Sequence, residues 1–390
     1  MALSDEEMWD YALGLRYDNG KPVAVCQLSS GDVYYSVYEK VGKEPYDAGS
    51  ILIQGLLVDK QPKDLNNAVV ATTYEPDTML EGMLAMLTRG ATKIAPCPPT
   101  RTLNFNNSNA AKQKARGQLK GQVKFDWNRD QLKRFVCPEP PAPQLDLAST
   151  DNTPHVGYHT VHRIYLMAAY SLLRLHDLTT PDGKYVAAVL AGKDGRILAW
   201  GLNTNASNKS LHAEVNMLQS FHKYKQQPLG RSGLPEGCRI YSTLQCCKMC
   251  SGMVVASTRK SESIRVYYGM TDPTASDETA LTKLKLDQQL SGKKGEPIRG
   301  IKFGSTDDLA SSLDLDYKAK KATHQAGDAA SFGKTAPYQD VTSEIQRKYK
   351  KHFGPDAKTV KNPNVSKALE HVRAFLNHLN LVYTGEALVD

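Results

Sequence analysis

The sequence predicts a layered α/β protein in which helices pack on β-sheets, and three observations carry this prediction. Helical and strand-like patterns alternate between residues 161 and 269. A stretch without periodic apolar positions, CPEPPAPQLDLASTDNTPH (137–155), precedes this region, and its Pro, Ser and Thr content is typical of a linker. Similar patterns recur before that stretch. We therefore expect two related α/β units joined by a linker.

The region after the linker supplies the elements of one unit in order. VHRIYLMAAYSLLRLHDL (161–178) has a dense apolar helical pattern, and YVAAVLAGKDGRILAWG (185–201) predicts two strands around a turn. LHAEVNMLQSFHKY (211–224) repeats its apolar residues at the spacing of one helix face. The remaining expected elements are a strand (239–244), a helix (248–259) and a strand (264–269).

An internal repeat indicates that the chain contains this unit twice. TYEPDTMLEGMLAMLTR (73–89) and TLQCCKMCSGMVVASTR (243–259) are identical at six of seventeen positions. PVAVCQLSSGDVYYSVY (22–38) has the same strand–turn–strand pattern as residues 185–201, and a helix pattern (6–17) precedes it. We interpret the N-terminal part as a second copy. Chance similarity between amphipathic elements is the alternative.

These patterns divide the chain into four expected segments. They are a degenerate copy (1–136), a linker (137–157), a second copy with the candidate site (158–300) and a helical C-terminal extension (301–390). Within the extension, residues 340–353 and 365–379 predict helices. We expect His371 on the exposed face of the latter helix.

Composition excludes several classes of protein. Among 390 residues, 41% are hydrophobic and 23% charged, and no apolar run approaches the ~20 residues of a membrane span. The acidic N-terminus lacks the features of a secretory signal. Seven unevenly spread cysteines do not form a disulfide framework. We expect a cytoplasmic protein whose thiols serve a metal or catalysis.

Charge permits a polyanionic partner without requiring one. The net charge is +8, and basic residues concentrate in three runs, at 112–124, 283–295 and 346–353. Each run alone is typical of a solvated helix or loop. The three together favour a nucleic-acid partner.

Cys247 and Cys250 form a C-x-x-C arrangement where a predicted strand meets a predicted helix. This spacing lets two thiolates converge on one ion, and the N-terminal end of a helix favours their negative charge. Cys246 is expected to point away from its neighbour. A redox C-x-x-C is the main alternative, but it leaves the histidine motif upstream unexplained.

His212 and Glu214 complete a candidate zinc site. Two sulfurs, one imidazole nitrogen and an open fourth position are typical of catalytic zinc, which lowers the pKa of a coordinated water. Glu214 stands two residues after the histidine, where its carboxylate can accept and return the proton of that water. The alternative is a structural zinc site with Cys238 as its fourth ligand.

These motifs resemble those of the zinc-dependent cytidine/deoxycytidylate deaminase superfamily, which has H-A-E followed by P-C-x-x-C. The chain is most similar to the tRNA-adenosine-deaminase-like branch, through a G-x-N segment (201–203), TLQCCKMCSG (243–252) and V-x-x-G (266–269). The resemblance spans about residues 160–272. It implies a three-layer α/β/α fold of the cytidine-deaminase type, here duplicated.

The resemblance also implies roles for individual residues. It makes His212, Cys247 and Cys250 ligands of Zn²⁺, Glu214 the proton shuttle, and Asn203 and Ala213 contacts of the substrate. The chain departs from the family pattern at two positions, with Gln245 in place of glutamate and Cys246 in place of proline. This departure affects the expected conformation of the loop and leaves the ligand set intact.

The first copy lacks the ligands. Asp77 and Leu80 stand opposite Cys247 and Cys250, and a loose alignment puts Ala48-Gly-Ser50 opposite His212-Ala-Glu214. Members of the tRNA-acting branch commonly dimerise. We therefore expect the degenerate copy to pack on the other as an intramolecular pseudo-dimer.

The leading hypothesis is a zinc-dependent hydrolytic deaminase that acts on an adenine or cytosine base within RNA, as in tRNA modification, or within single-stranded DNA. The second hypothesis is a deaminase of a free nucleobase, nucleoside or nucleotide. A third, from a different class, is a non-catalytic binding module stabilised by zinc. The presence of Glu214 argues against the third.

Overall fold

The structure is a computed structural model that describes residues 2–40, 42–88, 91–126, 145–147, 156–175, 186–224, 233–259, 263–270, 363–379 and 381. Most of the expected linker lies outside the described residues. So do the basic runs at 283–295 and 346–353 and the helix expected at 340–353.

Residues 2–126 form what we call the first unit. Its elements are α1 (Asp5–Asn19), β1 (Val23–Gln27), β2 (Val33–Val37), α2 (Ala48–Asp59), the short 3-10 helix η1 (Pro62–Leu65), β3 (Val69–Thr72), α3 (Thr78–Thr88), β4 (Lys93–Pro96), α4 (Phe105–Ala115) and β5 (Leu119–Gln122). Among the described residues its sheet has the strand order β4-β3-β1-β2-β5. The helix and two strands expected within residues 6–38 are present.

The described residues from 156 onward form the second unit. Its elements are α5 (Val156–Leu172), the 3-10 helix η3 (Leu173–Leu175), β6 (Ala187–Ala191), β7 (Ile197–Leu202), α6 (Ala213–Tyr224), β8 (Arg239–Leu244), α7 (Lys248–Ala256), β9 (Arg265–Met270) and α13 (Pro363–His378). In the described part of this unit the strands follow the order β7-β6-β8-β9. Every element that the sequence predicts between residues 161 and 269 is confirmed, with ends shifted by a few residues.

Local sequence explains where these elements begin and how deeply they lie. At the start of α1, Ser4 and Glu7 form a capping box, in which each side chain accepts a hydrogen bond from the other's backbone N–H. Gly20 ends this helix in the left-handed conformation, at φ 65°. The central strands β1 and β6 read VAVCQ and AAVLA and are buried at every position, as expected for strands covered by helices on both faces.

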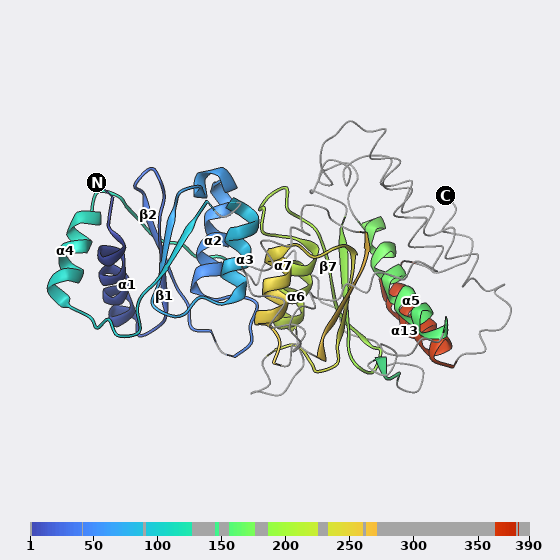
Figure 1. The fold of residues 1–390 in the computed structure, drawn as a ribbon. Coiled ribbons are helices and arrows are strands. Elements are labelled where there is room, and N and C mark those ends of the chain that lie inside the picture. The colour runs from blue at the N-terminus through green and yellow to red at the C-terminus, as the bar shows by residue number, and fades with distance from the viewer. Residues whose placement is uncertain are drawn as a thin grey trace.

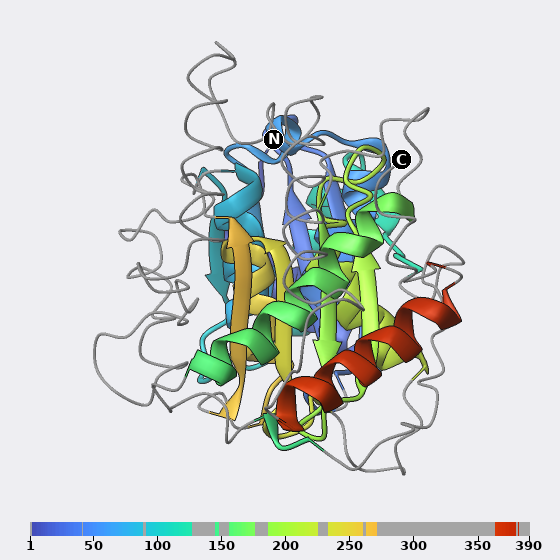
Figure 2. The same cartoon turned by 90° about the vertical axis from the view of Figure 1, so that its right-hand side faces the viewer.

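Each sheet lies between two layers of helices (Figure 1). The first sheet has α1 and α4 on its outer face and α2 and α3 on its inner face. The second has α6 and α7 on its inner face, while α5 and α13 cross its outer face (Figure 2). The predicted three-layer α/β/α architecture is thus confirmed, and it occurs in both units.

The two sheets share one topology. In the first, β1 pairs antiparallel with both β2 and β3, and β3 pairs parallel with β4. In the second, β6 pairs antiparallel with both β7 and β8, and β8 pairs parallel with β9. The first sheet differs in its additional edge strand β5, which pairs parallel with β2.

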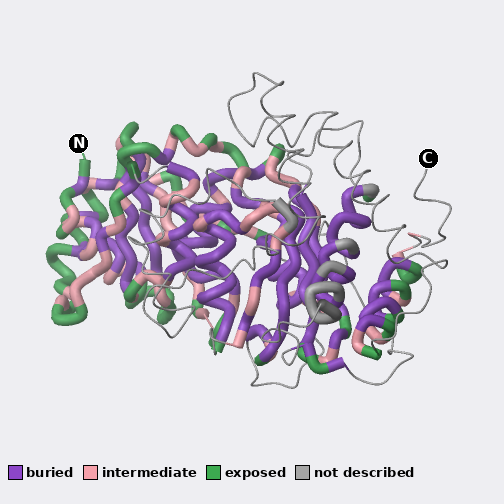
Figure 3. The backbone as a smooth tube through the Cα atoms, turned by 45° about the vertical axis from the view of Figure 1, so that its right-hand side comes forward, coloured by how far each residue is buried: buried purple, intermediate pink, exposed green. Residues whose placement is uncertain are grey.

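The units meet where α3 packs against α7. A methyl group on Gly82 would lie 2.4 Å from the carbonyl oxygen of Lys248, and one on Gly252 would lie 2.1 Å from the carbonyl oxygen of Thr78. The Thr78 hydroxyl also donates a hydrogen bond to the Gly252 carbonyl oxygen, at 3.3 Å. These contacts are reciprocal: each helix presents a glycine to the backbone of the other. Buried residues of both units form one continuous cluster here (Figure 3).

Helix α13 confirms the amphipathic pattern of residues 365–379 but corrects one expectation. Its apolar residues are buried against α5 in a second cluster. His371, expected at the surface, is only 5% exposed, because its ring packs against the turn at Gly195, where an added methyl group would lie 3.1 Å from the imidazole. Burial lowers the pKa of this imidazole. None of the helices in the described ranges has both the length and the apolar character that a bilayer span needs.

Candidate active site

The three candidate metal ligands come from the starts of the two inner helices of the second unit. His212 directly precedes α6, Cys247 is the N-cap residue of α7, and Cys250 lies in the first turn of α7. The His212 Nδ1 atom lies 3.4 Å from Cys247 Sγ and 3.5 Å from Cys250 Sγ, and the two sulfurs are 3.6 Å apart. Among the described residues, these three form the only such group of potential ligands.

This arrangement fits a tetrahedral metal ion. Zinc bonds of about 2.0–2.3 Å place neighbouring ligand atoms about 3.3–3.8 Å apart, and the three observed separations lie in that range. Cys238 and Cys246 lie outside the group. The alternative of a structural site closed by Cys238 is therefore not supported. Cys238 is instead fully buried, and burial raises its pKa to about 12.

The thiols differ in their readiness to ionise. The pKa of Cys247 lies well below its usual range, chiefly because of its hydrogen bond with Cys250 and also because of the His212 imidazole. Burial raises the pKa of Cys246 well above its usual range, and the nearby Glu214 carboxylate adds to this effect. Burial also raises the pKa of Cys250 well above its usual range, so within the hydrogen-bonded pair it is Cys247 that ionises first.

Glu214 lies in the first turn of α6 with 3% of its surface exposed, and its carboxylate is surrounded by donors. The Ser242 hydroxyl donates to Oε1 at 2.8 Å, and the Cys246 thiol donates to the same oxygen at 3.5 Å. The Cys250 thiol lies 3.3 Å from Oε2. The carboxylate thus borders the group formed by His212, Cys247 and Cys250.

Ser242 is a component of this site that the sequence did not reveal. It lies in β8 and is fully buried, on the same strand face as Ile240, which packs in the cluster shared by both units. Its neighbour Tyr241 faces the opposite side, towards the α5 cluster. Successive residues of RIYSTL face opposite sides of the sheet, so the sequence puts Ser242 on the same face as Ile240. It does not say which helices cover that face, and so the place of Ser242 in the site could not be predicted.

Asn203 and Ala213 lie at the two ends of the segment that joins β7 to α6, and Ala213 directly follows His212. Asn203 follows β7 directly and is 2% exposed, and its side-chain amide donates to Asn205 Oδ1 at 3.1 Å. Ala213 begins α6 and is fully buried. Its carbonyl oxygen would lie 2.4 Å from a methyl group on Gly201, so only glycine fits at that position of β7. Their contacts with substrate stay predictions.

The corresponding positions of the first unit hold a different set of side chains. Asp47 is the N-cap residue of α2, so Asp47-Ala-Gly49, and not Ala48-Gly-Ser50, occupies the place of His212-Ala-Glu214. The loose alignment is therefore shifted by one residue relative to the helix starts, although the two strand-to-helix loops (38–47 and 203–212) have the same length. Lys40 Nζ lies 2.6 Å from Asp77 Oδ2, and the Tyr74 hydroxyl accepts a hydrogen bond from the Gly49 N–H at 2.7 Å.

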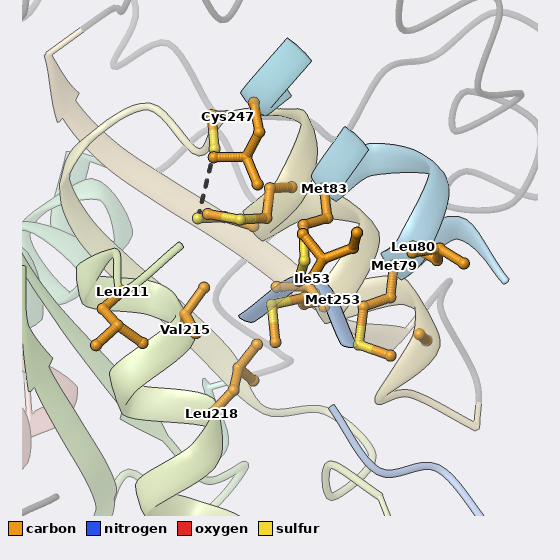
Figure 4. Close-up of a cluster of buried hydrophobic side chains, with 14 of the residues drawn as sticks. Ile53, Met79, Leu80, Met83, Leu211, Val215, Leu218, Cys247 and Met253 are labelled. Atoms are coloured by element: carbon orange, nitrogen blue, oxygen red, sulfur yellow. Dashed lines mark hydrogen bonds between the residues drawn. The ribbon is translucent and has the colours of Figure 1, made fainter. Parts of the chain in front are cut away.

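The cluster formed by both units connects the metal-ligand group to the first unit. Figure 4 shows Cys247 beside Met83, with Ile53 and Met79 of the first unit near Met253. The helix that carries both cysteines thus rests on side chains of the first unit. Leu211 and Val215, which flank the segment from His212 to Glu214, belong to the same cluster.

An α/β/α layer with a His-Cys-Cys group and an adjoining buried glutamate defines a class of protein, the nucleobase deaminases. Comparison with known proteins agrees. A family model described as Bd3614-like deaminase matches residues 178–292. A solved structure from a study of A-to-I editing by tRNA deaminases at the wobble position of transfer RNA is 30% identical to this chain. The similarity covers 28% of this chain and 73% of that one, with a TM-score of 0.23.

Two further solved structures are similar at lower identity. One is NE0047 in complex with 2,6-diaminopurine, 21% identical over 38% of this chain and 79% of that chain, with a TM-score of 0.26. The other is a guanine deaminase from Nitrosomonas europaea, 18% identical over 40% of this chain and 90% of that chain, with a TM-score of 0.24. No curated protein sequence matches the chain. The family match lies in the region of the candidate site and includes His212, Glu214, Cys247 and Cys250.

Proposed function

We propose that the second unit is a zinc-dependent hydrolytic deaminase that replaces the amino group of an adenine or cytosine base with a carbonyl oxygen. One observation carries this proposal: the buried Glu214 carboxylate borders the group formed by His212, Cys247 and Cys250. In a non-catalytic zinc module this carboxylate would have no proton to transfer. Burial of such a group is costly unless hydrogen bonds compensate it.

In the proposed reaction the residues of this chain bind, orient and transfer protons. His212, Cys247 and Cys250 would hold the ion, which supplies a water of lowered pKa when it is bound. Glu214 would accept one proton from the attacking water and deliver it to a ring nitrogen as the new C–O bond forms. It would then take the remaining proton of the added hydroxyl and deliver it to the amino group, whose bond to carbon breaks, so that a carbonyl oxygen and ammonia result. Ser242, by donating to Oε1, leaves the other carboxylate oxygen directed at the ligand group.

The proposed substrate is a base within RNA or single-stranded DNA. The motif resemblance to the tRNA-acting branch and the net charge of +8 support this proposal. A free nucleobase, nucleoside or nucleotide is the second candidate, and one observation favours it. In the basic run 112–124, Lys114 pairs with Glu7 and Lys120 pairs with Asp32, so neither ammonium group is wholly available to phosphates.

We also propose that the first unit descends from the same domain and serves as the partner of the second within one chain. The shared strand order and the reciprocal approach of Gly82 and Gly252 support this proposal. Cytoplasmic location stays a prediction.

One experiment tests the activity and distinguishes the substrates. The zinc-loaded chain is incubated with free bases, nucleosides, and RNA and DNA oligomers, and ammonia release is followed at increasing salt. We expect release from an oligomer, with a rate that falls steeply as salt rises, because phosphate contacts displace counterions. Release from small molecules alone, insensitive to salt, would establish the second candidate.

A pair of variants tests the role of Glu214. Glu214→Gln should lower the rate by about 10²–10⁴-fold and leave the metal content unchanged, because it removes the proton carrier and spares the ligands. Glu75→Gln is the matched control, since Glu75 is an exposed carboxylate of the first unit. Full turnover by Glu214→Gln on every substrate would refute the proposed chemistry.

A further inference from the structure

The loop that ends on His212 joins β7 to α6 and runs from Asn203 to His212. It is tightly folded: the Thr204 N–H donates to the Leu211 carbonyl oxygen at 2.9 Å, and the His212 N–H donates to the Ser210 carbonyl oxygen at 3.0 Å. The Asn208 Oδ1 atom accepts from both the N–H and the hydroxyl of Ser210, at 3.0 and 2.7 Å. The position of Ser210 therefore determines where the imidazole two residues later can lie.

Gln54, in helix α2 of the first unit, bonds to this loop across the boundary between the units. Its side-chain amide donates to Ser210 Oγ at 3.3 Å, and its backbone carbonyl oxygen accepts from Asn208 Nδ2 at 2.7 Å. Its Oε1 atom accepts from Gln219 Nε2, in α6, at 3.2 Å. One residue of the first unit thus contacts the loop before His212 and the helix after it.

All four members of this network are shielded from solvent. Gln54, Ser210 and Gln219 are 0% exposed and Asn208 is 4% exposed. A buried amide that loses its partners is destabilising, and water does not reach this network to replace them. The network therefore favours one placement of the loop over all others. Apolar contacts in the same region restrict the loop less, because their energy depends little on the relative orientation of the groups, whereas that of a hydrogen bond depends on it strongly.

We propose that Gln54 is a positioning residue for the metal site of the second unit. It does not touch the ligand group; it acts through Ser210 and Asn208 on the backbone that presents His212. The first unit, which lacks the ligands, thereby contributes to the affinity of the second unit for its metal. This inference rests on the proposed function for its biological meaning, but metal binding alone tests it.

The test compares two glutamine-to-methionine variants of the full chain. Gln54→Met keeps the length of the side chain and removes its side-chain hydrogen bonds to the second unit. Gln27→Met is the matched control, because Gln27 is a buried glutamine of the first unit (5% exposed) whose Oε1 accepts from Leu3 within that unit. The affinity of each metal-free protein for Zn²⁺, and for Co²⁺ as an optical probe of thiolate ligation, is measured by competition with a chelator.

We expect Gln54→Met to weaken metal binding by about tenfold, the scale on which residues that orient ligands act. Gln27→Met should change it by less than about twofold, whatever its effect on thermal stability. A metal affinity that neither variant changes would overturn the inference. So would an equal loss in both, because the effect would then follow from general destabilisation of the first unit.

Hydrogen exchange of the metal-free proteins provides a second readout. Backbone amides of residues 204–212 should exchange faster in Gln54→Met than in Gln27→Met, because Ser210 has lost its hydrogen bond with the side chain of residue 54. Unchanged exchange there would contradict the proposal. Neither readout requires turnover, so a chain that binds metal as expected but releases no ammonia would refute the deaminase proposal and leave this inference standing.

Discussion

The two units share a strand order and the positions of their inner helices, but they differ at the residues that begin those helices. In the second unit, His212 and Cys247 precede α6 and α7 and converge with Cys250. In the first, Asp47 and Asp77 stand at those places.

The first unit fills the corresponding space with a charge pair and hydrogen bonds. Lys40 pairs with Asp77, and the Asp47 carboxylate caps α2 by accepting from the Ser50 N–H at 2.7 Å. The helix starts are therefore held together without the His-Cys-Cys set. The comparison teaches that this α/β/α layer forms in the first unit without a His-Cys-Cys set, so the architecture alone does not require these residues in the second unit.

The largest expected effect concerns the cysteines. Cys247→Ala should weaken zinc binding by more than about 100-fold, because loss of a ligand exceeds the loss of a group that only orients one. Cys246→Pro, which restores the family's residue, should leave zinc bound. Asp77→Ala, at the equivalent position of the first unit, should also leave it bound. Metal content after dialysis measures all three.

Equal zinc loss in Cys247→Ala and Cys246→Pro would mean that the ligand assignment is wrong. Zinc loss in Asp77→Ala would mean that the start of α3 in the first unit affects metal binding by the second unit.

The next effect concerns the contact between the units. Gly82→Ala and Gly252→Ala should each lower the free energy of unfolding by about 2–3 kcal/mol, because each methyl group would meet backbone of the opposite helix. Chemical denaturation measures the loss. Gly117→Ala is the control, since a methyl group there has no atom within 4 Å. Strongly unequal losses of unfolding free energy in Gly82→Ala and Gly252→Ala would show that the two helices do not contribute equally to the contact.

The smallest effect is a pH dependence in the first unit. Burial, with a contribution from the charge on Asp77, raises the pKa of Asp47 to about 6. Because the folded pKa lies above the unfolded value, the folded state binds more protons between about pH 4 and 6, and stability rises as the pH falls through that window. Relative to Asp47→Asn, the wild-type chain should gain about 1–2 kcal/mol between about pH 7 and pH 4.

Denaturation at a series of pH values measures this difference. A difference between wild type and Asp47→Asn that stays constant across this range would contradict the assigned pKa. In the second unit the equivalent residue is the candidate ligand His212.

Much of the fold and part of the site follow from the sequence. The strands of the second unit are short apolar runs, two of them around a turn, and the C-x-x-C spacing at a strand–helix junction predicts that Cys247 and Cys250 converge. Ser242 could not be predicted, because its role depends on which face of β8 the inner helices cover. Gln54 could not be predicted either, since its partners lie in another unit and only packing of α3 on α7 brings them together.

The contact between α3 and α7 joins two parts of one polypeptide, and this has a consequence for how the protein behaves on dilution. Two separate subunits part when their concentration falls below the dissociation constant of their interface. Here the effective concentration of one face around the other is set by the chain that connects them and does not fall with dilution. The support that Gln54 gives to the His212 loop is therefore the same in a cell that holds a few copies of the protein as in a concentrated solution.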